Sequence, residues 1–157
     1  MKFRDVQGIW HTKPNHKQII KRTSAYGIII KENKAFLIKP TWNNLGELPG
    51  GGVDPEESTE QALKREFLEE TSHKITNHNP NPIIKVKNNF YANDLNEYFD
   101  SEMQFFIVNQ IEKSNHSIDS KEIKTVGWTD LNLITPRNMH IDHYAALKKA
   151  YQILKEL

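Results

Sequence analysis

Residues 50–73 read GGGVDPEESTEQALKREFLEETSH, and the interpretation of the whole chain begins from this stretch. Ser58 is followed three residues later by Gln61, which is the pattern of a capping box. We therefore expect a helix from about Thr59 to Thr71. Three glycines stand before it, and glycine lets the backbone adopt positive φ and approach a ligand closely. The stretch predicts a glycine loop that leads into a helix.

The end of this predicted helix carries three carboxylates on one face. Glu66, Glu69 and Glu70 fall within about 100° of arc on a helical wheel. Glu66 and Glu70 border the apolar stripe of Leu63 and Phe67, so we expect both to be partly buried. Burial and like charges raise the pKa of a carboxyl group unless a cation neutralises it. A purely structural helix would avoid this arrangement, whereas a helix that binds a hard divalent cation needs it.

Composition is compatible with a metal site made of oxygen ligands. The chain has no cysteine, which excludes thiolate ligands and disulfides and is typical of a cytoplasmic protein. Residues 54–70 contain seven acids and two bases, although the whole chain has a net charge of +1. Such a cluster suits a cation site that receives an anionic substrate, and a solvated acidic helix is the alternative. Without sulfur or paired histidines nearby, Mg²⁺ or Mn²⁺ is expected rather than zinc.

Outside this stretch the sequence predicts strands and a second helix. Apolar runs at residues 24–30 and 35–38, separated by a turn, predict a β-hairpin. Further strands are expected at residues 83–86, 89–92, 103–108 and 124–129. Large apolar side chains recur every three or four residues from Ile141 to Leu154 and predict a helix. This order of elements predicts an α/β fold with a mixed sheet between helices.

The length of 157 residues suits one domain, on which residues 1–20 are expected to pack as an N-terminal extension. No apolar run approaches the roughly 20 residues needed to span a bilayer, so no membrane partner is expected. The loose basic run from Lys13 to Arg22 lacks the interleaved aromatics of a nucleic-acid interface, so no stable nucleic-acid partner is expected either. A homodimer is left open.

The spacing of the acidic stretch resembles the signature box of the Nudix hydrolases. Gly51 opens the box, five residues separate it from Glu57, and seven more separate Glu57 from Arg65-Glu66. Phe67 fills the apolar position, and Glu69-Glu70 complete the acids. Six fixed positions coincide, which makes the resemblance specific.

Two residues at the end of the box, Gly51–His73, depart from the family pattern. Ser72 stands where the family has glycine, and His73 stands where it has an apolar residue. Glycine at the first position caps the helix in the left-handed conformation. We expect serine there to cost about 1 kcal/mol or less and to leave the carboxylates in place.

The resemblance implies an α/β/α sandwich and Mg²⁺-dependent hydrolysis of a nucleoside diphosphate linked to another group. The metal ligands that it implies are Glu57, Glu66, Glu69, Glu70 and the backbone carbonyl of Gly50. It implies that Arg65 orients these carboxylates. The general base is left open between Glu66 within the box and Glu122 on a downstream loop.

The substrate is expected to be a small-molecule nucleotide. The compact chain resembles enzymes that clear oxidised nucleoside triphosphates, with a monophosphate and pyrophosphate as products. Tyr91 stands where diadenosine polyphosphate hydrolases carry a tyrosine, whereas Asn89 stands where ADP-ribose hydrolases carry a proline. The alternatives are a diadenosine polyphosphate hydrolase, an ADP-sugar hydrolase and a catalytically silent nucleotide sensor, although every box carboxylate is present. The candidate substrate-binding residues are Arg22, Trp42 and Tyr91.

Overall fold

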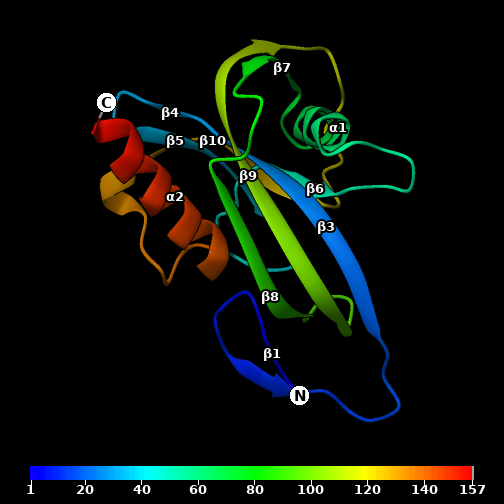
Figure 1. The fold of residues 1–157 in the computed structure, drawn as a ribbon. Coiled ribbons are helices and arrows are strands. Elements are labelled where there is room, and N and C mark those ends of the chain that lie inside the picture. Colours follow the sequence, from blue (N-terminus) through cyan, green and yellow to red (C-terminus); the bar gives the residue numbers. More distant parts are fainter. Residues whose placement is uncertain (157) are drawn as a thin grey trace.

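The computed structural model describes residues 1–156 (Figure 1). In chain order the elements are β1 (Lys2–Arg4), β2 (Trp10–Thr12), β3 (Ile19–Ile28), β4 (Ile30–Lys31), β5 (Lys34–Pro40), β6 (Gly50–Gly52), α1 (Thr59–Thr71), β7 (His73–His78), β8 (Ile84–Ala92), β9 (Glu97–Lys113), β10 (Ile123–Asp130), the 3₁₀ helix η1 (Leu131–Leu133) and α2 (Ile141–Lys155). The predicted bounds of α1 are confirmed, and α2 ends one residue beyond its predicted range. Among these residues, no helix is both long and apolar enough to cross a membrane.

Seven of the described strands form one mixed sheet. Its order is β2-β1-β8-β9-β3-β6, and β7 also pairs with β9. β8 and β9 are antiparallel neighbours, whereas β3 runs parallel to β9 from Ile19, opposite Tyr98, to Ile28, opposite Ile107. The glycine strand β6 pairs antiparallel with β3. The glycine loop and the start of α1 therefore lie at the β6 edge of this sheet.

A second, three-stranded sheet has the order β10-β5-β4. The turn between β4 and β5 contains Glu32 and Asn33, both with positive φ, as in a type I′ hairpin turn. The predicted hairpin is correct only for the pairing of β4 with β5 across this turn. Residues 24–28 belong to β3, which pairs with β9 and β6 rather than with β5. Because residues 24–29 are all buried, their apolar run does not show which sheet they join.

The two long helices cover opposite faces of the large sheet (Figure 1). α1 buries Leu63 and Phe67 in a cluster that includes Phe106 of β9. α2 buries Leu147 in a separate cluster that includes Phe105 of β9. Phe105 and Phe106 reach different clusters because successive side chains of a strand point to opposite faces. The predicted α/β class, with a mixed sheet between helices, is confirmed.

Strands β6 and β7 and the continuity of strand β8 were not predicted. Strand β6 consists of glycine alone, and strand β7 buries a single apolar residue, Ile75, so neither carries a strand pattern. The predicted strands at residues 83–86 and 89–92 are one continuous strand, β8. The N-terminal residues form the antiparallel pair β1–β2, which joins the edge of the large sheet through β8.

Ser72 ends α1 in the left-handed conformation, with φ 58° and ψ 29°. Its backbone N–H donates to the carbonyl of Leu68 at 2.9 Å. Its hydroxyl lies 2.9 Å from the carbonyl oxygen of Ser114 and 2.6 Å from that of His116. The expected left-handed cap is present, and the serine hydroxyl adds contacts to the following loop that glycine could not make.

Candidate active site

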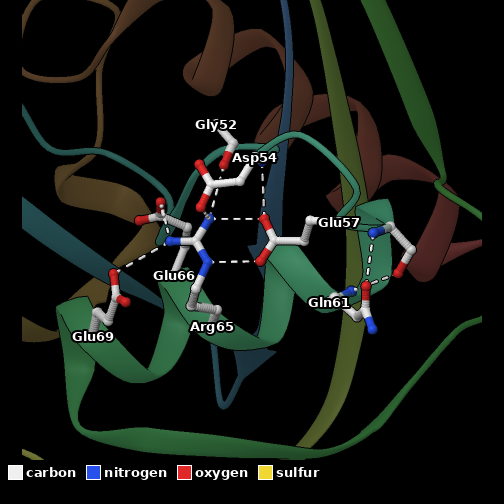
Figure 2. Close-up of polar contacts among 8 residues, drawn as sticks. Gly52, Asp54, Glu57, Gln61, Arg65, Glu66 and Glu69 are labelled. Carbon is white, nitrogen blue, oxygen red and sulfur yellow. Dashed lines mark hydrogen bonds and ion pairs between the residues drawn. The ribbon is translucent and has the colours of Figure 1, made fainter.

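A capping box fixes the start of α1 next to the glycine loop. The backbone N–H of Gln61 donates to Ser58 Oγ at 3.1 Å, and the backbone N–H of Ser58 donates to Gln61 Oε1 at 2.8 Å (Figure 2). Two otherwise unpaired donors of the first helical turn are thereby satisfied. The carboxylates about two and three turns later are held in a defined position relative to residues 50–52.

The guanidinium of Arg65 lies at the centre of the acidic cluster (Figure 2). It donates to Glu57 through Nε at 2.7 Å and Nη2 at 2.9 Å, which is the two-pronged geometry that arginine forms with carboxylates. It also donates to Glu66 Oε1 at 2.9 Å, to the carbonyl of Gly52 at 3.0 Å and to Glu69 Oε2 at 3.4 Å. The hydrogen bonds from Arg65 and from the Asp54 backbone lower the pKa of Glu57 to about 2. Arg65 therefore connects three candidate ligands to the glycine loop.

Glu66 and Glu70 are partly buried, as the helical wheel predicted. Burial raises the pKa of Glu66 despite its hydrogen bond to Arg65. Burial also raises the pKa of Glu70 well above its ordinary value, although the backbone N–H of Gly50 donates to it at 2.8 Å. Nearby negative charges on Glu66, Glu47 and Glu122 raise it further. An added cation would relieve this electrostatic cost.

The donor set fits a hard divalent cation, because it consists of carboxylate and backbone oxygens. Glu57, Glu66, Glu69 and Glu70, with the carbonyl of Gly50, are the groups that could hold it. In residues 1–156, no three histidine, aspartate or glutamate side chains converge closely enough to share a cation. Glu57, Glu66 and Glu69 are turned towards Arg65, so they would have to reorient to bind one together. Only glycine fits at position 51 without displacing Glu66, since a Cβ on Gly51 would lie 2.6 Å from the carboxyl carbon of Glu66.

The structure also brings Glu122 towards this cluster. Glu122 lies on the turn before β10, and its carbonyl accepts a hydrogen bond from the backbone N–H of Thr41 at 2.9 Å. Its side chain is exposed, and its charge contributes to the raised pKa of Glu70. Of the two candidate bases, Glu66 is therefore half-buried within the cluster and Glu122 approaches it from solvent.

A cavity of about 190 Å³ contains two of the three predicted substrate-binding residues, Arg22 and Trp42. Arg22 lies between the cavity and the glycine loop, because a Cβ on Gly52 would come 3.3 Å from its Nε. Its guanidinium also lies 5.4 Å from the ring centre of Phe99. The remaining lining residues include Glu47, Phe90, Asp94, Leu95 and His140. A cationic side chain thus connects the acidic cluster to a cavity with aromatic and acidic walls.

Glu47 is a further functional candidate, which was not predicted from the sequence. Burial, followed by the nearby charge of Asp94, raises its pKa to about 7. Its backbone is fixed by two hydrogen bonds with Ile38, of 2.8 and 2.9 Å. The available signal was its place as the one charged residue between Leu45 and Pro49, immediately before the box.

Tyr91 does not join the cavity. Its neighbours on β8, Phe90 and Ala92, line the cavity, and alternation along a strand places Tyr91 on the opposite face. There its ring lies 4.4 Å from that of His11 and 4.8 Å from that of Tyr98, measured between ring centres. Its hydroxyl donates to Asn96 Oδ1 at 3.1 Å. Tyr91 therefore packs beneath the N-terminal strands.

A larger cavity, of about 430 Å³, lies away from the acidic cluster. It is formed by β5, β10 and the segment that follows them, and its lining includes Leu37, Gly127, Trp128 and Leu133. No carboxylate of the box contributes to it. Volume alone therefore does not identify the site of chemistry, and the smaller cavity beside Arg22 is the better candidate.

Comparison with known proteins agrees with this arrangement. The model of the NUDIX domain family matches residues 21–150. The chain therefore belongs to the NUDIX domain family, and the predicted resemblance and enzyme class, a Nudix hydrolase, are confirmed.

Among curated proteins, a Bacillus subtilis (strain 168) protein provisionally named an 8-oxo-dGTP diphosphatase is 43% identical over 54 residues. This match covers 31% of the chain and 34% of that relative, so it spans about a third of the relative's length.

Solved structures share the fold at low sequence identity. A MutT NUDIX hydrolase from Burkholderia pseudomallei has a TM-score of 0.67 at 21% identity, covering 82% of this chain and 96% of that one. The NUDIX domain of Shewanella oneidensis NrtR, crystallised with ADP ribose, has a TM-score of 0.66 at 20% identity, covering 88% and 90%. These similarities concern the fold.

Proposed function

We propose that the chain hydrolyses the pyrophosphate bond of a nucleoside triphosphate, releasing a nucleoside monophosphate and pyrophosphate, and that it requires Mg²⁺ or Mn²⁺. The observation that carries this proposal is the intact set of box carboxylates, three hydrogen-bonded to Arg65 and the fourth to the backbone of Gly50, beside a cavity that Arg22 lines. The B. subtilis relative, named for action on an oxidised nucleoside triphosphate, favours the same substrate class.

The proposed division of labour follows from the contacts of each side chain. Glu57, Glu66, Glu69 and Glu70, with the Gly50 carbonyl, would hold the cation. When bound, the cation would neutralise phosphate oxygens and make water more acidic. Arg65 holds Glu57 through two hydrogen bonds and Glu66 through one, and so keeps the carboxylates in position without serving as a ligand.

A carboxylate must accept the proton of the attacking water. Glu66 is the preferred candidate, because its side chain is half-buried within the cluster and hydrogen-bonded to Arg65 beside the other candidate ligands. Glu122 is the alternative, because it approaches the same cluster from the downstream turn. After hydrolysis the proton would leave to solvent from the exposed edge of the cluster.

The remaining groups would bind the substrate. Arg22 would attract the phosphate chain, because it lies between the cluster and the cavity. The cavity of about 190 Å³ is smaller than the roughly 300 Å³ at the low end of drug-sized sites, so it suits a single base rather than a whole nucleotide. Trp42, Phe90 and His140 offer aromatic surfaces, and Glu47 offers a hydrogen-bonding group to the base.

The test is to incubate the protein with a panel of nucleotides, with Mg²⁺ and separately with EDTA, and to identify products by chromatography. The panel includes ordinary and oxidised nucleoside triphosphates, ADP-ribose and a diadenosine polyphosphate. We expect a nucleoside triphosphate to yield monophosphate and pyrophosphate only in the presence of the cation. Efficient turnover of ADP-ribose or the dinucleotide in preference to every triphosphate would replace the proposed substrate class. Nucleotide binding without any turnover would indicate a sensor instead.

A further inference from the structure

The N-terminal residues form a tightly held turn outside the range that matches the NUDIX model, 21–150. The carboxylate of Asp5, 2% exposed, accepts the backbone N–H groups of Gln7 at 2.9 Å and Ile9 at 3.0 Å. His11 Nε2 lies 2.7 Å from its second oxygen. Gly8 supplies the positive φ, 86°, that the turn needs. Residues 5–9 therefore have a fixed shape.

Three contacts attach this turn to the body of the protein. The backbone N–H of Ile141 donates to the carbonyl of Val6 at 2.9 Å. Arg4 pairs with Asp142 at 2.6 Å in the first turn of α2, and this carboxylate is 4% exposed. Asp5 also accepts from Asn93 Nδ2 at 3.3 Å, in the turn between β8 and β9.

Both elements that hold the turn also supply walls of the cavity beside Arg22. His140 comes from the start of α2, and Asp94 and Leu95 come from the turn between β8 and β9. Val6 is the residue of the N-terminal turn that lines the same cavity, and it is partly buried. Through Val6, the N-terminal turn thus forms part of the wall of this cavity.

We propose that the turn of residues 5–9 is a wall of the base-binding site and that Val6 limits the size of the base that fits. The proposal rests on the proposed function for the placement of the base in this cavity. It assigns to the N-terminal extension a role in substrate selection. Its fixed backbone makes it a rigid wall, and a change of side-chain volume at residue 6 alters the space directly.

The test compares Val6→Phe and Val6→Ala with the unchanged protein. The larger side chain should exclude a bicyclic purine more than a pyrimidine, and the smaller one should do the reverse. A methylene-scale change in a pocket alters discrimination by roughly tenfold or more. We therefore expect Val6→Phe to lower the purine-to-pyrimidine ratio of kcat/KM about tenfold, through KM and with kcat largely kept. Calorimetry with purine and pyrimidine nucleoside monophosphates measures the corresponding ratio of dissociation constants, Kd.

Ile9→Ala is the matched control, because Ile9 belongs to the same turn, is 54% exposed and does not line the cavity. Its ratios should equal those of the unchanged protein. The proposal would be overturned if folded Val6 variants kept the purine-to-pyrimidine ratios of KM and Kd of the unchanged protein. It would also be overturned if Ile9→Ala shifted these ratios as much as the Val6 variants do. If the unchanged protein binds monophosphates but hydrolyses nothing, the proposed function fails, and the Kd ratios still decide the role of Val6. An absence of nucleotide binding would overturn both.

Discussion

A side chain on residue 51 would clash with the carboxyl group of Glu66, because a Cβ on Gly51 would come 2.6 Å from the carboxyl carbon. At Gly50 the conflict is different. Its φ is +152°, and a Cβ would lie 2.0 Å from the backbone carbonyl oxygen of Ala25 on β3. Gly51 therefore leaves room for a candidate ligand, whereas Gly50 lets β6 pair with β3.

This difference predicts separate effects of two similar substitutions. Gly51→Ala should lower kcat at least tenfold by displacing Glu66, with a free energy of unfolding within about 1 kcal/mol of the unchanged protein. Gly50→Ala should lower the free energy of unfolding by about 3 kcal/mol, because backbone must move. Urea unfolding and initial rates measure both. Gly127→Ala is the control, since its Cβ would meet no atom within 4 Å. Wild-type turnover in Gly51→Ala would contradict the role given to the Glu66 position.

Replacing each candidate base in turn distinguishes Glu66 from Glu122. A general base contributes about 10²–10⁴-fold to the rate, most when its pKa lies near the working pH. Because Glu66 lies half-buried within the cluster whereas Glu122 is exposed, we expect Glu66→Gln to lower kcat at least about a hundredfold and Glu122→Gln by less than about tenfold. Glu56→Gln, at an exposed loop residue, serves as the control. The opposite ranking would assign the base to Glu122.

A buried histidine pair predicts acid sensitivity. The rings of His140 and His143 stack at 4.1 Å, and His143 Nδ1 accepts the backbone N–H of Leu48 at 3.0 Å. Burial lowers the pKa of His140 to about 4 and that of His143 well below its usual value. As the pH falls below about 6.5, the unfolded chain binds protons that the folded protein does not, so the free energy of unfolding falls.

Each histidine should contribute about 1.4 kcal/mol per pH unit to this fall, and His140 should stop contributing near pH 4. His143→Gln keeps an acceptor for Leu48 and removes one titrating group. Urea unfolding between pH 4.5 and 6 should therefore show a slope smaller by about one proton. An unchanged slope would contradict the neutral, buried state of His143.

Glu47 predicts a stability effect of opposite sign. Burial and Asp94 raise its pKa from 4.5 to about 7. A carboxyl group with a raised pKa favours folding below pH 4.5, and this contribution is lost as the pH rises through 7. Glu47→Gln should therefore raise the free energy of unfolding at pH 8, by up to about 3 kcal/mol, and change it little at pH 4.5. Equal effects of Glu47→Gln on the free energy of unfolding at both pH values would contradict the raised pKa of Glu47.

Much of the acidic helix α1 could be predicted from the sequence, because its start, its end and its buried face depend on local patterns. The capping box of Ser58 and Gln61 fixed its start, and the wheel placed Glu66 and Glu70 at the edge of the core. The left-handed cap at Ser72 followed from the position of that residue after the last helical turn. Each of these depends on residues within a few positions in the chain.

Features that depend on pairing between distant segments could not be predicted from the sequence. The buried run at residues 24–28 fits either sheet, and its parallel pairing with β9 connects residues about eighty positions apart. Tyr91 stood at a suggestive spacing after the box, but the face of β8 that it occupies depends on the register with β9. Glu47 is positioned by backbone pairing with Ile38, and its raised pKa depends on the charge of Asp94, which lies on a distant turn.

The central claim is that the carboxylates of α1 support cation-dependent hydrolysis of a nucleotide. The most direct measurement compares Glu69→Gln with Glu60→Gln in the presence of Mg²⁺, using the nucleoside triphosphate turned over by the unchanged protein. Both residues are exposed glutamates on the same helix, but Glu69 contacts Arg65 within the cluster and Glu60 pairs with Lys64 outside it. We predict that Glu69→Gln loses at least a hundredfold in kcat with its fold intact, while Glu60→Gln keeps normal turnover. Full activity of a folded Glu69→Gln protein would contradict the account.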